Sequence, residues 1–454
     1  MVRDLRAVLR GDVIDRDHPV YDQARRVWNG LVDRRPAVMA RCLDTTDVVE
    51  AIRIARQYRP LVSIRGGGHQ VAGTAVCDDG LVVDLSRMKA IEVDADRRTA
   101  SAQPGVLWGE LDRTTQAFGL ATPGGEVSLT GVAGLTLGGG MGLIMRAHGL
   151  SCDNLRSIEI VTADGEVRRA SRDASRDLWW AARGGGRGLG VVTRFEFDLH
   201  PLGPDVATAQ VLYAYEDAER VLRAFRDLAP TMPEQVAPEL VLWSVLPDPQ
   251  IPESLHGRKI VFVLGVYAGP PEEGDAVLAP LKALAEPVAD LSGIAPYVAV
   301  QSSVDAILPD GGRYYMKSHF TDTLSDECIR VMLEADRWRP TPESLIVIRT
   351  LGGAVGRVPP EDSAYAHRAA RFNVSVDAAW FDPALDAAAV SWSRSTWDAL
   401  RPFSTGGVYL NFAGLEDEAG AVRGAVLGAS GERLDRIRRQ YDPDGLFDAA
   451  ARRL

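Results

Sequence analysis

Glycine is concentrated in one part of this chain, and that concentration limits what the chain can fold into. Of the 44 glycines in 454 residues, 23 lie between Gly66 and Gly190. They include Gly-Gly-Gly triplets at 66–68, 138–140 and 184–186, whose unequal spacing excludes a repeat array. Apolar residues with strand or helix periodicity lie between the triplets, which argues against a flexible linker. We therefore expect a folded region whose backbone approaches something closely, or adopts positive φ, at many positions.

Regular elements are predicted on both sides of the glycine clusters. In the first half, a helix capped by Thr46 or Asp47 ends before Pro60, and a strand at 61–65 leads into the first triplet. Further elements of this half are strands at 81–85, 158–162, 166–170 and 191–199, and helices after Pro104 and at 178–182. After Pro201 and Gly203-Pro204, amphipathic helices such as 218–228 alternate with apolar strands such as 259–267. The last fifty residues are predicted to hold a strand at 408–412 and a helix at 431–440.

Composition excludes several classes of protein. Lys plus Arg is 51 and Asp plus Glu is 62, a net charge of −11 with no basic block, so nucleic acid and anionic membrane are poor partners. The four cysteines form no CxxC pair, and no metal-ligand spacing occurs, so no metal site is expected. The one uncharged stretch of membrane length, 127–145, contains six glycines and is too weakly apolar to insert. With no signal-peptide pattern at the N-terminus, a cytoplasmic location is expected.

The glycine motifs differ in what they indicate. Gly138–Gly142 loosely resembles the dinucleotide fingerprint GxGxxG, but it lacks the strand, helix and acidic residue that a Rossmann site requires. No P-loop, HExxH or GxSxG motif occurs. Arg65-Gly66-Gly67-Gly68-His69 is different, because three glycines after a strand expose consecutive N–H groups that suit a pyrophosphate. His69 would then lie against the bound group, although an exposed loop histidine is the alternative.

Three segments carry a resemblance to a known family. They read RGGGHQVAGTAVCDDGLVVDLS from residue 65, GVAGLTLGGGMGLIMRAHGLSCDNL from 131, and DLWWAARGGGRGLGVVTRFEF from 177. They resemble the FAD domain of the p-cresol methylhydroxylase (vanillyl-alcohol oxidase) superfamily, and within it the bacterial berberine-bridge-enzyme-like oxidases. The similarity continues through YMKSHF, RFNVSVDAAWFDP, VYLNF and YDPDGLF, and so spans nearly the whole chain.

The resemblance implies an α+β fold of two domains. A PCMH-type FAD-binding domain is expected at 1–205, with the C-terminal segment 401–454 returning to it. A substrate domain at 206–400 is expected to present an antiparallel sheet flanked by helices.

The resemblance also implies that FAD is bound covalently through His69, with a non-covalent site as the alternative. The position of a second, cysteinyl link in some relatives is Val127 here, so one bond is expected. The other cofactor-binding residues implied are Arg65, Gly66, Gly67, Gly68, Gln70, Thr130, Gly131, Gly134, Leu135, Gly138, Gly139, Gly140, Gly142, Asp153, Asn154, Val191 and Val192. At the glycines, a Cβ would push FAD away from the N–H groups that hold it. Asp153 and Asn154 have an equal alternative role as turn formers.

For catalysis, relatives use a tyrosine of a Y-x-N motif, which is Tyr409 and Asn411 here. On a strand these two side chains would point the same way, and Tyr409 as a base would need a pKa well below ~10. A core tyrosine is the alternative. Substrate-facing positions are expected on the strand that contains Arg313, Tyr314, Tyr315 and Lys317, although surface or core placement is an equal alternative for each.

The expected reaction transfers a hydride from a C–H next to O or N of a small molecule to the flavin. Molecular oxygen would take the electrons and leave as hydrogen peroxide. The alternatives are a flavin dehydrogenase with another acceptor, and a non-redox binding protein. Nothing in the sequence sets the oligomeric state, and a homodimer is the expectation only by base rate.

Overall fold

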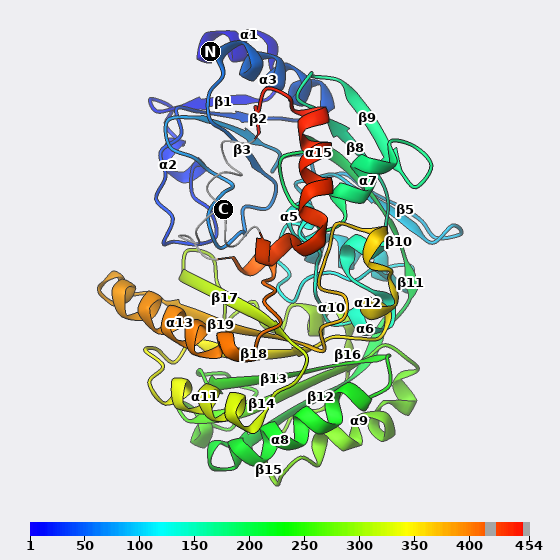
Figure 1. The fold of residues 1–454 in the computed structure, drawn as a ribbon, viewed down its shortest axis with the longest axis vertical. Coiled ribbons are helices and arrows are strands. Elements are labelled where there is room, and N and C mark those ends of the chain that lie inside the picture. The colour runs from blue at the N-terminus through cyan, green and yellow to red at the C-terminus, as the bar shows by residue number, and fades with distance from the viewer. Residues whose placement is uncertain (414–423, 448–454) are drawn as a thin grey trace.

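A parallel-stranded sheet near the N-terminus carries the first glycine loop. The computed structural model describes residues 1–413 and 424–447 (Figure 1). The strand order of this sheet is β1 (Asp12–Asp15), β2 (Val38–Arg41), β4 (Leu81–Asp84), β3 (Val62–Arg65), with β1 antiparallel to the rest. Helix α3 (Thr45–Tyr58) packs its apolar side against these strands. Its cap is Asp44 rather than the predicted Thr46 or Asp47, because the Asp44 carboxylate accepts both of their N–H groups.

A second, antiparallel sheet carries the other glycine loops. Its order is β5 (Ile91–Asp94), β6 (Thr99–Ala102), β10 (Val191–Asp198), β8 (Leu155–Val161), β9 (Val167–Ser171). Helices α4 (Trp108–Gln116), α5 (Val132–Leu137) and α7 (Arg176–Ala182) contribute apolar residues to the same core as this sheet. The second and third triplets follow α5 and α7, so both loops begin where a helix ends.

The second half of the chain forms one large antiparallel sheet. Its order is β15 (Pro287–Asp290), β12 (Asp205–Ala214), β14 (Lys259–Tyr267), β13 (Val236–Ser244), β18 (Leu345–Thr350), β19 (Phe372–Trp380), β17 (Arg313–Thr321), with β16 (Gly293–Pro296) beside β12. Its helices are α8 (Ala218–Leu228), α9 (Gly274–Lys282), α11 (Asp326–Arg337) and α13 (Asp386–Leu400). They cover one face, and the other face is directed to the N-terminal half (Figure 1).

The alternation of side chains decides which residues each face receives. On β19, Val374, Val376 and Ala378 lie in the helix-covered core, so Ser375 and Asp377 point to the opposite face. On β17, Tyr315 lies in that core, whereas Tyr314 and Met316 pack in a separate cluster with Trp28 of the N-terminal half.

The C-terminal segment crosses back to the N-terminal half. Helix α15 (Gly431–Tyr441), red in Figure 1, runs alongside that half and packs Leu434 and Ile437 into the core of the antiparallel glycine-loop sheet. The predicted strand at 408–412 is wrong. Residues Leu410–Phe412 form a 3-10 turn, η9, in which the Phe412 N–H donates to the Tyr409 carbonyl at 3.0 Å.

Membrane-spanning helices and metal clusters are both absent from the residues that the structure describes. None of the helices in 1–413 and 424–447 is long and apolar enough to span a membrane. Within the same ranges, no group of three or more His, Cys, Asp or Glu side chains is arranged to hold a metal ion.

Candidate functional site

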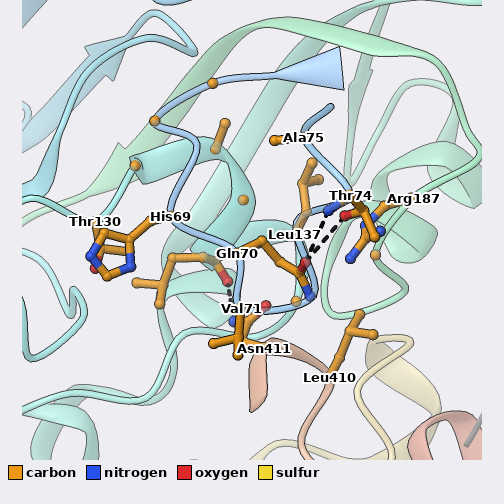
Figure 2. A pocket seen from close by; sticks show the side chains of 18 of the residues that line it. His69, Gln70, Val71, Thr74, Ala75, Thr130, Leu137, Arg187, Leu410 and Asn411 are labelled. Atoms are coloured by element: carbon orange, nitrogen blue, oxygen red, sulfur yellow. Dashed lines mark hydrogen bonds between the residues drawn. The ribbon is translucent and has the colours of Figure 1, made fainter. Parts of the chain in front are cut away.

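A large cavity lies between the glycine loops and the face of the large sheet that its helices do not cover. Its empty volume is about 1810 Å³, including its open mouth. The N-terminal half supplies the loops around Gly67, Gly131 and Gly188. The large sheet supplies Met316, Arg349 and Asp377, and η9 closes one side (Figure 2).

The structure brings many of the predicted site residues together around this cavity. Those that line it are Gly66, Gly67, Gly68, His69, Gln70, Thr130, Gly131, Gly134, Leu135, Gly138, Val192, Tyr409 and Asn411. Val127, at the position of the second link in some relatives, also lines it, whereas the free thiol of Cys152 is buried in a neighbouring apolar cluster.

The other predicted residues lie behind the lining. Arg65 pairs with buried Asp84 at 2.5 Å, and Val191 packs in the core under the parallel-stranded sheet. Asp153 accepts hydrogen bonds from Arg368. The Asn154 side-chain amide donates to two backbone carbonyls. These bonds fit the turn-forming role that was the alternative to cofactor binding. Gly139, Gly140 and Gly142 pack against protein rather than the cavity.

The physical reason for most of these glycines is contact between loops. A Cβ on Gly67 would lie 2.6 Å from the Gly131 Cα, and one on Gly131 would lie 2.6 Å from the Gly67 nitrogen. A Cβ on Gly138 would lie 2.0 Å from Asn411 Oδ1. Only at Gly134, among these four, would a Cβ meet nothing within 4 Å, because that position faces the open cavity. The expectation that a Cβ would chiefly displace the ligand is therefore revised, since the loops first need glycine to reach each other.

Gly131→Ala is expected to lower the free energy of unfolding of the flavin-free protein by about 1–3 kcal/mol. The new methyl group would push backbone against backbone, which cannot yield as a flexible side chain does. Urea unfolding followed by circular dichroism measures the change. Gly134→Ala is the matched control, and equal unfolding curves for the two variants would contradict the loop-contact explanation.

His69 is held in a stack of rings. Its imidazole lies 4.0 Å from the Trp28 ring at 17°, and Trp28 lies 3.9 Å from the Tyr314 ring at 3°. Burial lowers the pKa of His69 to about 4, so the imidazole is neutral at pH 7. Its Nε2 atom is buried without a hydrogen-bond partner. A neutral, oriented and unpartnered nitrogen at a cavity wall is what covalent attachment to a ligand requires.

Tyr409 and Asn411 lie together, although not through the predicted strand. The Tyr409 hydroxyl accepts hydrogen bonds from the N–H groups of Gly140 at 3.0 Å and Met141 at 3.1 Å, and from Asn411 Nδ2 at 2.9 Å. Burial nevertheless raises the pKa of Tyr409 to about 12, because desolvation outweighs these donors. The lowered pKa that a tyrosine base needs is therefore not found in the protein alone.

The predicted substrate-facing strand contributes different residues from those expected. Of the four predicted positions on β17, Tyr314 packs toward the N-terminal half, in the ring stack. Arg313 pairs with Asp386 at 2.5 Å, Tyr315 lies in the helix-covered core, and Lys317 lies 4.3 Å from the Trp397 ring. Met316, which was not predicted, lines the cavity.

Sequence reasoning missed an acid–arginine cluster made of Glu126, Glu239, Arg349, Ser375 and Asp377. The Arg349 guanidinium holds the Glu126 carboxylate through two hydrogen bonds of 2.6 and 2.7 Å, and donates to Ser375 Oγ at 2.8 Å. Asp377 Oδ2 accepts a hydrogen bond from Ser375, and Asp377 Oδ1 is buried without a hydrogen-bond partner.

Two acids of this cluster have raised pKa values. Burial raises the pKa of Asp377 to about 6. Burial and the Glu126 charge raise the pKa of Glu239 far above its usual range. Only pairing of distant strands assembles this cluster.

The residues around the cavity fit FAD. The unpartnered His69 Nε2 matches a flavin attachment point, and Gly134 leaves open space for a ring or chain. Buried Arg187 Nη1 and Gln70 Nε2, also on the lining, are donors without partners and would suit phosphate or carbonyl oxygens. When bound, FAD would supply a two-electron acceptor.

Comparisons with known proteins agree with this site. A family model described as FAD binding domain matches residues 36–171. The uncharacterised FAD-linked oxidoreductase YgaK of Bacillus subtilis is 30% identical over 452 residues, covering 97% of this chain and 96% of that protein.

Two solved structures share the fold. BBE-like 1 of Physcomitrella patens superposes with a TM-score of 0.88 at 22% identity, covering 98% of this chain and 97% of that one. The 6-hydroxy-D-nicotine oxidase of Arthrobacter nicotinovorans superposes with a TM-score of 0.86 at 25% identity, covering 97% and 96%. The predicted fold class and family resemblance are confirmed, and the non-redox alternative is set aside. This chain belongs to the family of FAD-linked oxidoreductases.

Proposed function

We propose that the protein is an oxidase with covalently bound FAD, which takes a hydride from a C–H next to O or N of a small molecule. The observation that carries the proposal is the position of His69, which lines the same cavity as Glu126, Arg349 and Asp377 of the acid–arginine cluster and whose buried Nε2 has no hydrogen-bond partner. Residues 1–205 and 401–454 would hold FAD, and 206–400 would supply the substrate face. The predicted cofactor residues that line the cavity would contact FAD directly, and those behind the lining would hold the loops.

The covalent bond is proposed to form through His69 Nε2 alone. The Trp28 ring on one face of the imidazole would hold it in a fixed orientation, and its neutral state would leave the nitrogen lone pair available. No cysteine lines the cavity in the described parts of the chain, which supports a single link. The visible spectrum of the protein before and after acid precipitation tests the bond.

Oxygen is proposed as the electron acceptor, with hydrogen peroxide as the product. Support comes from the similarity to a protein named 6-hydroxy-D-nicotine oxidase. Mixing the reduced protein with air-saturated buffer in a stopped-flow instrument separates the alternatives. Reoxidation within one turnover time, with release of peroxide, supports an oxidase, and much slower reoxidation supports a dehydrogenase with another acceptor.

The substrate is proposed to carry an O–H or N–H whose proton is removed as the hydride leaves. Tyr409, with Asn411 beside it, is the proposed acceptor, because it lines the cavity and three N–H donors on its oxygen offset part of the cost of burying a phenolate. Asp377 is a second candidate, favoured by its unpartnered Oδ1 at the cavity and its pKa of about 6. Asp377 and Tyr409 have different pKa values, so the pH dependence of the reaction distinguishes them.

The pH dependence of kcat/KM is expected to identify the acceptor. A carboxyl whose pKa is raised to about 6 is protonated and inactive below that pH, so activity through Asp377 would rise through pH 6 and then level. With a pKa of about 12, Tyr409 would give activity that keeps rising through pH 10. Replacing the true acceptor, by Asp377→Asn or by Tyr409→Phe, should abolish the rise of kcat/KM with pH that belongs to that residue and lower kcat/KM by about 10²–10⁴-fold. The other substitution should leave that rise in place. Flavin reduction at an unchanged rate in Tyr409→Phe would remove Tyr409 from this role.

We also propose a cytoplasmic location, supported by four cysteines that are all buried as free thiols. A homodimer is proposed on base rate only, and light scattering of the purified protein tests it.

A further inference from the structure

An arginine in the third glycine loop lines the cavity and has no charge partner among the described residues. Arg187 lies between Gly184 and Gly190, in the loop that joins α7 to β10, and lines the cavity. In Figure 2, His69 and Arg187 lie on opposite sides of Gln70.

The backbone of this loop is held from two directions. The Gly186 N–H donates to the Leu137 carbonyl at 2.9 Å. From α15, Arg438 donates to the carbonyls of Arg187 and Gly185, both at 2.9 Å. With the main chain fixed at three points, the Arg187 side chain is presented to the cavity from a rigid support.

Among the residues that the structure describes, those around Arg187 include like charges and no acid within salt-bridge distance. Burial, with Arg438 and Arg34 nearby, lowers the pKa of Arg187 to about 10, so the group is still a cation at pH 7. No carboxylate lies within salt-bridge distance of it in the described ranges, and its Nη1 is buried without a hydrogen-bond partner. The acidic residues that line the cavity, Glu126 and Asp377, belong to the cluster around Arg349. Arg187 is half-buried, and a partly desolvated cation without a partner is costly unless an anion binds there.

The neighbouring donors would also suit an anion. Thr74 lines the same region, and its N–H and hydroxyl both donate to Gln70 Oε1, which holds the Gln70 amide in place. Gln70 Nε2, like Arg187 Nη1, is a buried donor without a partner. The loop with Gly66, Gly67 and Gly68 supplies backbone to the same cavity.

We propose that Arg187 binds the pyrophosphate of FAD through charge-assisted hydrogen bonds, and that Gln70 Nε2 donates to the same part of the cofactor. The proposal rests on FAD binding in this cavity and is independent of the covalent bond to His69. In this protein, phosphate binding then depends on a side-chain cation as well as on glycine backbone.

Equilibrium binding of FAD and of riboflavin, which has no phosphate, tests the proposal. The parent protein is His69→Ala, so that flavin exchanges freely, and quenching of flavin fluorescence gives the dissociation constants. Arg187→Met is expected to weaken FAD binding by about 10- to 100-fold and to leave riboflavin binding unchanged, with Arg187→Lys intermediate. Equal weakening of both ligands, or of neither, would overturn it. If neither the wild type nor the parent protein holds any flavin, the proposed cofactor assignment itself fails.

Thermal unfolding gives a second readout that a purely structural role would not produce. Arg187→Met is expected to raise the Tm of the flavin-free protein, because it removes an unpaired and partly desolvated charge, and to reduce the gain in Tm on adding FAD. Arg349→Met is the matched control, and it should lower the Tm of the flavin-free protein because Arg349 is paired with Glu126. A lower Tm of the flavin-free Arg187→Met protein would contradict the proposal.

Discussion

Replacing His69 with alanine is expected to convert an acid-stable yellow protein into one that releases its colour. In the wild type, flavin should stay with the acid-precipitated pellet, because a covalent bond survives loss of the fold. In His69→Ala, the colour should move entirely to the supernatant. Turnover should also fall, since the electron-withdrawing link makes the flavin easier to reduce.

A second histidine provides the control. Burial lowers the pKa of His148 to about 4, as it does for His69, but His148 stacks on His200 at 4.0 Å and does not line the cavity. His148→Ala should keep its flavin in the pellet. Colour in the wild-type supernatant would refute the histidyl bond while leaving the fold intact, and a colourless wild type would contradict FAD binding.

Removing the Asp153 carboxylate is expected to cause the largest loss of stability among these variants. Asp153 accepts two hydrogen bonds, of 2.6 and 2.7 Å, from Arg368, which lies between β18 and β19, and a weaker one of 3.4 Å from Arg183. The three side chains are 3–6% exposed. Asp153→Ala would leave two buried guanidinium groups without their acid, which costs about 3–5 kcal/mol.

The loss should appear as a lower midpoint of urea unfolding and a lower Tm. Asp198→Ala is the matched control, because its partner Arg156 and Asp198 itself are each 48% exposed, and such surface pairs contribute about 0–1 kcal/mol. Similar midpoints for the two variants would show that Asp153 does not hold the halves together. Such a result would favour the direct cofactor contact that the sequence predicts for it.

The two parts of the site differ in how well sequence predicts them. The loops around His69, Gly131 and Gly138 are short local patterns, so their residues and their order along the chain are enough to identify them. The Y-x-N motif likewise identifies Tyr409 and Asn411, although the predicted strand is a 3-10 turn and their contact comes from the turn.

Trp28, Arg349 and Asp377 could not be found in this way. Trp28 has no motif, and it reaches His69 only because residues far apart in the sequence stack on each other. Arg349 and Asp377 come from β18 and β19, and join Glu126 of a loop more than two hundred residues earlier. Arg187 had one visible signal, a single cation inside a run of glycines, but its lack of a partner is a property of three dimensions.

The sequence by itself determined the family, the cofactor class, and the positions where loops need glycine. The family and the cofactor class followed from the resemblance of its motifs to a known family, and the glycine positions followed because close approach of the backbone is a local property of the chain. Only the tertiary structure decided which face of each strand meets the cavity. On β17, alternation defines two faces, and packing of α13 against one of them leaves Tyr314 and Met316 for the cavity side. Charge pairing was likewise decided by the fold, because the energy of a buried cation depends on acids that distant segments do or do not bring to it.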